Sequence, residues 1–487
     1  ENEGQSWKKI EVSALGVPSR CYVNDVKADL FDENTLYVAL DNHKEGDYRP
    51  YLVKSTDKGA SWTRIETGLG NKNLAWRIVQ DHVNKDLLFA GTEFGVYFTV
   101  DGGKSWTELT GGIPTISFRD LAIQRRENDL VAASFGRGFY ILDDYSALRN
   151  VNSSQITEEA TLFKPRKVWW YVQRSVLDFD DVRGSQGSQL YVAPNPDFGA
   201  VFTYYLKDSY KSMKGERQSE EKGKTGNVPF PGWDALDDET REMEPFVYVE
   251  IKDQSGNVVN REMATNKKGF NRVTWNLRVG ATRAMRKEGE IGDMDGLLCA
   301  PGTYTATLNK YMKGTYTQIA GPVNVEVVPM MEGTLKGSPM SEVVAFWRAF
   351  EDLSKDVDVL SIELSNTRKT ARKLFYAAAH ANVSDELLSE VSSLQKNLDE
   401  LDTQLNGNSA KNQIGERNGP TIGDRTFALW RGISTSTYGP TETHEETMRI
   451  IKTQWLELKD KLEEQKTITR SIAKRVVEAG GSWVEGM

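Results

Sequence analysis

The sequence is poor in the residues that build metal centres and disulfide frameworks. Its 487 residues include only 2 cysteines and 4 histidines. The cysteines, Cys21 and Cys299, lie far apart, and no CxxC or HxxxH spacing occurs, which excludes a zinc framework. We therefore expect two buried free thiols in preference to a disulfide, and no resident cofactor.

Long apolar runs and an excess of positive charge are also missing. No stretch approaches the ~18 consecutive apolar residues that span a bilayer, so no membrane span is expected. The 61 basic residues are outnumbered by 70 acidic ones, which gives a net charge of −9. A nucleic-acid partner is therefore disfavoured, because binding a phosphate backbone requires a basic surface.

Several signatures of catalysis are absent as well. The sequence has no nucleophile elbow, P-loop, dinucleotide fingerprint or HExxH motif. Asp178, Asp180 and Asp181 are candidates for holding a calcium ion, but their spacing lacks the usual loop-ligand pattern and favours a solvated loop.

What the sequence does contain is a repeat within residues 1–150. Three segments that begin at Val26, Ile78 and Leu121 each combine a short strand, a polar turn and an apolar strand, followed by a third strand. In the first two repeats the third strand runs into the pattern S/T-x-D-x-G-x-x-W, known as an Asp box. Its residues are Ser55, Asp57, Gly59, Trp62, Thr99, Asp101, Gly103 and Trp106. In this pattern Gly permits a tight turn, Asp and Ser/Thr form hydrogen bonds with the backbone of the turn, and Trp packs beneath it. We therefore expect a structural role for these residues.

Four-stranded repeats of this length predict the blades of a β-propeller, which closes with about four blades or more. Only about three repeats are present, by the same spacing. The segment Asn2-x-Gly4-x-x-Trp7 looks like the tail of another Asp box. We therefore expect an incomplete propeller over residues 1–150. The partners expected for it are upstream blades, from the same precursor or from another chain.

The rest of the chain predicts a multidomain, mainly β protein: partial β-propeller blades, then an Ig-like β-sandwich, then an α-helical bundle. Residues 151–195 are expected to be a connector. Residues 196–330 form the sandwich, with a polar insertion at 207–244 expected to be a mobile loop. Residues 331–487 form an antiparallel helical bundle. Its expected helices are 341–381, 384–405, 443–464 and 467–479, with 409–440 as a loop.

The repeats resemble the BNR or Asp-box propellers of sortilin-type and xyloglucanase-type proteins. The likeness is sharpest at "DNHKEGDYRPYLVKSTDKGASW", "LLFAGTEFGVYFTVDGGKSW", "RDLAIQRRENDLVAASFGRGFYILDD" and "APGTYTATL". Together these segments are similar to the C-terminal half of secreted bacterial, Bacteroidetes-type, sortilin-like proteins. The resemblance implies a secreted, periplasmic or cell-surface location. It implies architecture more than activity, because a fold does not determine a function.

Charged residues near the start of the innermost strands are the candidates for a functional site. A glycosidase requires two carboxylates across a cleft, and Asp25, Glu93 and Asp120 are candidates by position. Asp41 is a further candidate of the same kind. Arg77, Arg119 and Arg137 are candidates for binding. The alternative, which we favour, is a structural role in which these side chains form ion pairs between the blades.

Two functions follow. The first is a non-catalytic secreted or cell-surface binding or scaffold protein whose propeller binds a protein or peptide partner. The alternative is a polysaccharide-directed glycoside hydrolase of xyloglucanase-like type, with a glycan ligand and an active site shared with N-terminal blades. The absence of a visible catalytic constellation favours the first.

Overall fold

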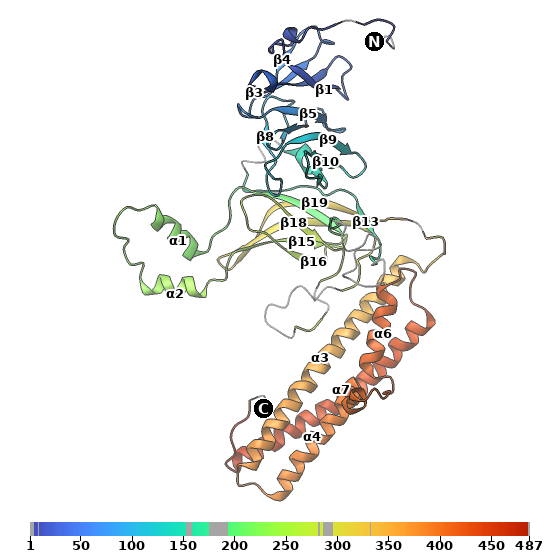
Figure 1. Ribbon diagram of the computed structural model, residues 1–487. Helices are drawn as coiled ribbons and strands as arrows, with labels where there is room; N and C mark the ends of the chain where they lie inside the picture. Colours follow the sequence, from blue (N-terminus) through green and yellow to red (C-terminus); the bar gives the residue numbers. More distant parts are fainter. Residues whose placement is uncertain are drawn as a thin grey trace.

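The computed structural model describes residues 4–7, 9–151, 158–174, 193–280, 283–285, 296–331 and 333–485. The molecule is elongated (Figure 1). Three stacked sheets lie at one end, two further sheets lie in the middle, and a bundle of long helices forms the other end.

The three stacked sheets correspond to the three predicted repeats. In the first sheet and the second sheet, four antiparallel strands pair in sequence order, whereas the third sheet has three strands in the order β11-β10-β9. The strands of the first sheet are β1 (Tyr22–Ala28), β2 (Leu36–Asn42), β3 (Asp47–Ser55) and β4 (Thr63–Arg64). Those of the second are β5 (Ala75–Gln80), β6 (Leu88–Thr92), β7 (Val96–Thr99) and β8 (Thr107–Glu108). Those of the third are β9 (Phe118–Gln124), β10 (Asp129–Ser134) and β11 (Phe139–Leu142).

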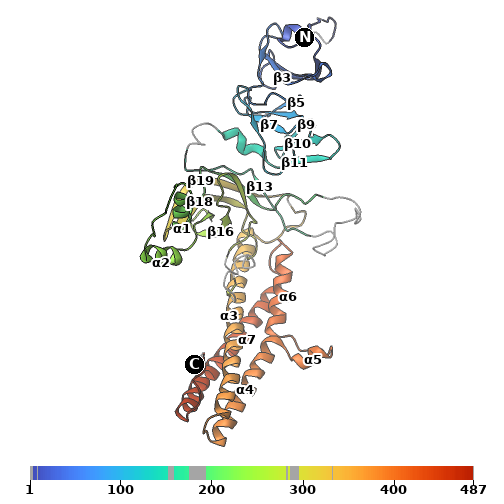
Figure 2. The ribbon, with the colours of Figure 1, turned by 60° about the vertical axis from the view of Figure 1, so that its left-hand side comes forward.

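The three sheets lie one upon another in a stack (Figure 2). Apolar side chains hold them together: Tyr37 and Leu52 from the first sheet pack with Ile78 and Leu88 from the second. A separate core joins the second sheet to the third. The arrangement follows from the sequence pattern, since both faces of β2 and β6 are buried and neither strand alternates with polar residues. Stacked four-stranded sheets of this kind are propeller-like.

The middle of the molecule has a sheet of three strands, in the order β12-β14-β17, and one of five, in the order β13-β19-β18-β15-β16. The strands are β12 (Ala160–Leu162), β13 (Val168–Trp170), β14 (Ala200–Leu206), β15 (Phe246–Lys252), β16 (Val258–Ala264), β17 (Gly269–Trp275), β18 (Gly302–Met312) and β19 (Thr315–Pro329). Two of them, β12 and β13, come from the stretch expected to be a connector, and β13 pairs in parallel with β19. The Ig-like assignment stays a prediction.

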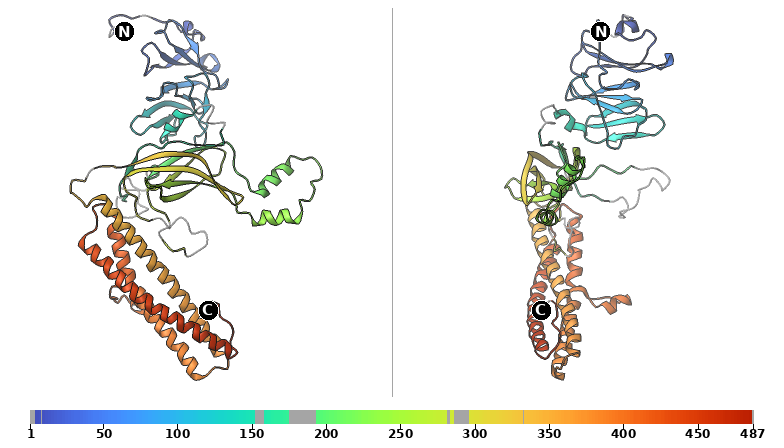
Figure 3. Two further views of the ribbon diagram at one scale, coloured as in Figure 1. Left: turned by 180° about the vertical axis from the view of Figure 1, so that it is seen from behind. Right: turned by 90° about the vertical axis from the view of Figure 1, so that its left-hand side faces the viewer.

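The polar insertion is not a loop, and that expectation was wrong. It contains α1 (Met213–Lys222) and α2 (Trp233–Arg241), which project from the sheets (Figure 3). Ser212 caps α1 by accepting a hydrogen bond from the backbone of Gly215, and Arg217 forms an ion pair with Glu221 one turn later. Charged Glu, Lys and Arg residues favour helices, so low apolar content did not imply an irregular segment.

The helical bundle is present, but two of its details differ from the expectation. The helices are α3 (Met340–Ala379), α4 (Asp385–Asn406), α5 (Ser409–Gln413), α6 (Ile422–Ser434) and α7 (Glu442–Glu478). The supposed loop at 409–440 contains α5 and α6, because Thr421 and Asp424 form a capping box that starts α6. The two predicted C-terminal helices are one continuous helix, α7. Within the described residues, no helix has both the length and the apolar character needed to cross a membrane.

Candidate functional site

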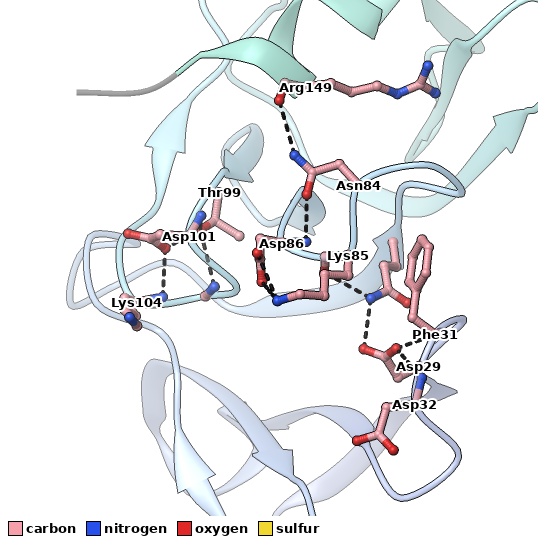
Figure 4. Close-up of polar contacts among 12 residues, drawn as sticks. Asp29, Phe31, Asp32, Asn84, Lys85, Asp86, Thr99, Asp101, Lys104 and Arg149 are labelled. Atoms are coloured by element: carbon pink, nitrogen blue, oxygen red, sulfur yellow. Dashed lines mark hydrogen bonds and ion pairs between the residues drawn. The ribbon is translucent and has the colours of Figure 1, made fainter. Parts of the chain in front are cut away.

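The stacked sheets carry two sets of charged residues, and the first set lies in the Asp boxes. Each lies in the turn that follows a third strand. Asp101 accepts a hydrogen bond from the backbone of Lys104 at 2.8 Å (Figure 4). It also accepts hydrogen bonds from the hydroxyl of Thr99 at 2.6 Å and from the hydroxyl of Ser105 at 2.7 Å. Asp57 repeats this pattern in the first sheet, with Ser55 and Ser61.

These bonds stabilise the ionised form of each Asp-box aspartate. The hydroxyl and backbone of Ser61 are the main cause that lowers the pKa of Asp57 to about 2. Such a carboxylate neither gives nor takes a proton near neutral pH.

The Asp-box tryptophans differ in how they are packed. Trp106 is buried, and its indole nitrogen donates a hydrogen bond to the carbonyl of Ile65 at 2.6 Å, which ties the second sheet to the segment after the first. Trp62 is half-buried and packs against the cluster around Leu15 and Leu40. Trp7, the corresponding residue of the partial motif, is 91% exposed.

The second set of charged residues lies on the inner strands β1, β5 and β9. Each of these strands carries a β-bulge at the same register position. The residues left without a partner in the register are Asn24, Trp76 and Arg119. Bulges re-aim side chains and are frequent beside functional sites.

The residues directly after the three bulges form one ion cluster. Asp25, Arg77 and Asp120 pair with Ala39, Gly91 and Ala133 of the neighbouring strands, so they are structurally equivalent. The Arg77 guanidinium lies 3.0 Å from the Asp25 carboxylate and 2.7 Å from the Asp120 carboxylate. Asp25 is buried and also accepts a hydrogen bond from the backbone of Ile78 at 3.2 Å. One arginine thus links three successive sheets.

Glu93 is the centre of a neighbouring group of contacts. Its carboxylate accepts hydrogen bonds from the Trp76 indole at 2.8 Å and from the Ser117 hydroxyl at 2.9 Å. The Arg119 guanidinium lies 3.6 Å from this carboxylate and 3.5 Å from the centroid of the Trp76 ring. Arg119 thus holds the Trp76 indole from its face, and Glu93 holds it at its edge through the indole nitrogen.

A pocket of about 380 Å³ opens beside this group, and we call it the rim pocket. Its lining combines aromatic rings, cations and one carboxylate. The lining residues are His43, Tyr48, Lys72, Leu74, Trp76, Glu93, Phe94 and Arg119. Tyr48 and Phe94 are exposed, so their rings are available to a ligand, whereas Trp76 is buried beneath Arg119.

The structure brings most of the predicted site residues together. Asp25, Arg77 and Asp120 share one ion cluster, and Glu93 and Arg119 line the rim pocket. Asp41 is buried and bonded to His43. Arg137 is exposed on the turn between β10 and β11 and does not line the rim pocket.

Sequence reasoning missed six of the eight residues that line the rim pocket: His43, Tyr48, Lys72, Leu74, Trp76 and Phe94. Trp76 had a usable signal, because it directly precedes Arg77 just as Arg119 precedes Asp120. Tyr48, Lys72 and Phe94 lie in or beside turns and follow no repeat. Among the described residues, no group of three His, Cys, Asp or Glu side chains is arranged to hold a metal ion. The calcium candidates Asp178, Asp180 and Asp181 lie outside those residues.

No protein-family model and no curated protein matches this sequence, so the sortilin and BNR resemblance has no support from sequence comparison. Solved structures include the β-propeller domain of a protein from Myceliophteria thermophila, at 15% identity and a TM-score of 0.22, with 28% of this chain and 44% of that chain covered. The extracellular domain of a one-component system from B. thetaiotaomicron matches at 13% identity and a TM-score of 0.20, with 63% of this chain and 31% of that chain covered. A GH74 xyloglucanase from Xanthomonas campestris matches at 12% identity and a TM-score of 0.22, with 61% of this chain and 38% of that chain covered.

The matches therefore span less than half of the length of each of these structures. Scores this low carry no argument about function. Residues 1–150 are classed as propeller-like because of the chain's own stacked sheets. The C-terminal end of the chain is helical instead.

Proposed function

We propose that this chain is a non-catalytic binding protein of the cell exterior that takes a peptide segment of a protein partner in the rim pocket. The observation that carries the proposal is that each candidate carboxylate is already held by an ion pair or by hydrogen bonds. Asp25 and Asp120 both pair with Arg77, and Glu93 is bonded by Trp76 and Ser117. A glycosidase needs one carboxylic acid that holds its proton and a second carboxylate free to act.

The chemistry of the rim pocket favours a peptide as its ligand. Exposed Phe94 and Tyr48 offer apolar surface to a hydrophobic or aromatic side chain. Lys72 and Arg119 add positive charge at the rim, and Arg119 is already partly balanced by Glu93. A segment that carries an apolar side chain beside an acidic one therefore complements the pocket best.

A displayed library of random dodecapeptides tests the proposal. Peptides selected on the wild-type chain are measured by calorimetry against Phe94→Ala and Lys72→Ala. We expect each substitution to weaken binding by about tenfold or more, since one lost anchor costs on the order of 1–2 kcal/mol. The control is Phe427→Ala, which removes another exposed ring from α6, outside the pocket.

Two results would overturn this function. One is selected peptides whose affinity is unchanged by both pocket substitutions. The other is release of reducing sugar from a panel of plant and algal glucans that disappears in Asp120→Asn, a substitution of an exposed carboxylate. That second result would favour the glycoside hydrolase.

A further inference from the structure

The repeat places three apolar residues at one equivalent position. In the second and third sheets this position lies on the face that packs against the preceding sheet. Val26, Ile78 and Leu121 each pair with the middle strand of their own sheet, opposite Val38, Ala90 and Ala132 respectively. Ile78 and Leu121 are 1% and 4% exposed because another sheet covers them, whereas Val26 in the first sheet is 56% exposed.

The opposite face shows the converse pattern. Leu52, Val96 and Phe139 are equivalent, since they pair with Ala39, Gly91 and Ala133. Leu52 and Val96 are fully buried, whereas Phe139 in the third sheet is 74% exposed. Ile141, two residues further along the same face, is exposed as well.

These positions meet in the two interfaces that the chain already contains. Leu52 belongs to the same core as Ile78, and Val96 belongs to the same core as Leu121. The repeating contact therefore joins the Leu52 position of one sheet to the Ile78 position of the next. Phe139 and Val26 are the two halves of one more such contact, and both are exposed.

A polar contact repeats along with the apolar one. Asp25 accepts a hydrogen bond from the backbone of Ile78 in the following sheet. Asp120 is the equivalent of Asp25, and its side chain is more than half exposed. A sheet packed on the third sheet with the same geometry would present the backbone of its Val26 position to Asp120. At the position of Arg77 the second copy would place its Asp25 next to Asp120, but each of these carboxylates already has a cation beside it, since Arg77 contacts both and Lys27 lies 3.7 Å from Asp25.

We propose that a second copy of this chain covers both faces, with the third sheet of each copy stacked on the first sheet of the other. The contact continues the two interfaces within the chain and brings Phe139 against Val26. Each contact joins unlike surfaces, and such head-to-tail contacts give a closed assembly when the rotation closes. With three sheets from each of the two copies, the closed assembly has twice three blades, a number within the range of about four to eight that closed propellers contain.

Light scattering after gel filtration, over about a hundredfold range of concentration, tests the pairing. The proposal predicts a dimer, and it predicts that Phe139→Glu and Val26→Glu each shift the chain to a monomer. Both side chains are exposed, so circular dichroism should be unchanged. Phe427→Glu is the control and should leave the dimer intact. A monomer at every concentration would overturn the proposal.

Cysteine crosslinking tests the head-to-tail direction separately. Val26→Cys and Phe139→Cys chains are prepared apart and then mixed under mild oxidation. Cys21 and Cys299 are buried, so the engineered thiols react first. The expected product is a disulfide between unlike chains, with little crosslinking in either chain alone. Equal crosslinking of each chain with itself would indicate like-to-like pairing and would contradict the proposal.

Discussion

The outer turns and the inner strands of the stacked sheets use the same residue types in different ways. In the outer turns, the hydrogen bonds of Asp57 and Asp101 reach only two to four residues along the chain. On the inner strands, Arg77 bonds Asp25 across 52 residues. Local bonds fix one turn, whereas long-range bonds fix the position of one sheet against another. The outer charges therefore stabilise single hairpins, and the inner charges stabilise the stack.

The largest effect is expected for Trp106→Ala, which compares a packed Asp-box tryptophan with an exposed one. The indole is buried between the first two sheets and donates to Ile65, so its loss leaves a cavity and an unpaired carbonyl. We expect the free energy of unfolding to fall by about 3–5 kcal/mol, measured by urea denaturation. Trp7→Ala is the matched control from the same motif and should change little. Similar losses in the two variants would break the contrast between packed and exposed copies.

Arg77→Met should have the next largest effect. It leaves the buried Asp25 carboxylate with Lys27 at 3.7 Å as its remaining cation. We expect a loss of about 2–3 kcal/mol, less than the ~3–5 kcal/mol typical of a fully buried pair. Arg126→Met removes an exposed partner of Glu127 and should cost under about 0.5 kcal/mol. Equal effects in the urea titrations would show that the inner cluster does not join the sheets.

Asp101→Ala should destabilise the chain by a smaller amount. It removes the acceptor for Thr99, Lys104 and Ser105 while leaving the sheet contacts in place. The expected loss is about 1–2 kcal/mol in the same titration, since the turn can rehydrate. A loss larger than that of Arg77→Met would reverse the order proposed for the outer and inner charges.

The smallest expected effect concerns pH. Burial raises the pKa of Asp101, but hydrogen bonds from Thr99, Ser105 and Lys104 outweigh it, so the folded pKa is lowered. A lowered folded pKa contributes stability above the ordinary aspartate value of about 3.9, and that contribution is lost as the pH falls through the folded pKa. Asp101→Asn should therefore weaken the dependence of unfolding free energy on pH below about 4. An acid limb identical to that of the wild type would contradict this assignment.

The same contrast explains what the sequence could predict. The Asp boxes were readable because the side-chain hydrogen bonds of Asp57 and Asp101 reach only a few residues along the chain. The equivalence of Asp25, Arg77 and Asp120 was readable from the repeat, although their common ion cluster required the register of three sheets. Tyr48, near the start of β3, and Phe94, in the turn between β6 and β7, were not readable, since residues at the ends of strands obey no period and meet only after the sheets have stacked.

The helical segments were misjudged for a different reason. The polar composition of residues 207–244 predicts a loop, yet capping by Ser212 and ion pairing of Arg217 suffice to form α1. Thr421 and Asp424 similarly start α6 within a stretch rich in Gly, Ser and Thr. Local hydrogen bonds of this kind outweigh the average composition of a segment.

The most direct test of the account is a double-mutant cycle between Asp25 and Arg77. Asp25→Ala, Arg77→Ala and the double variant are compared with the wild type by urea denaturation. If the inner charges hold the sheets together, the two substitutions should be coupled by about 1 kcal/mol or more. Additive losses, with no coupling between Asp25 and Arg77, would contradict the claim that this cluster is structural.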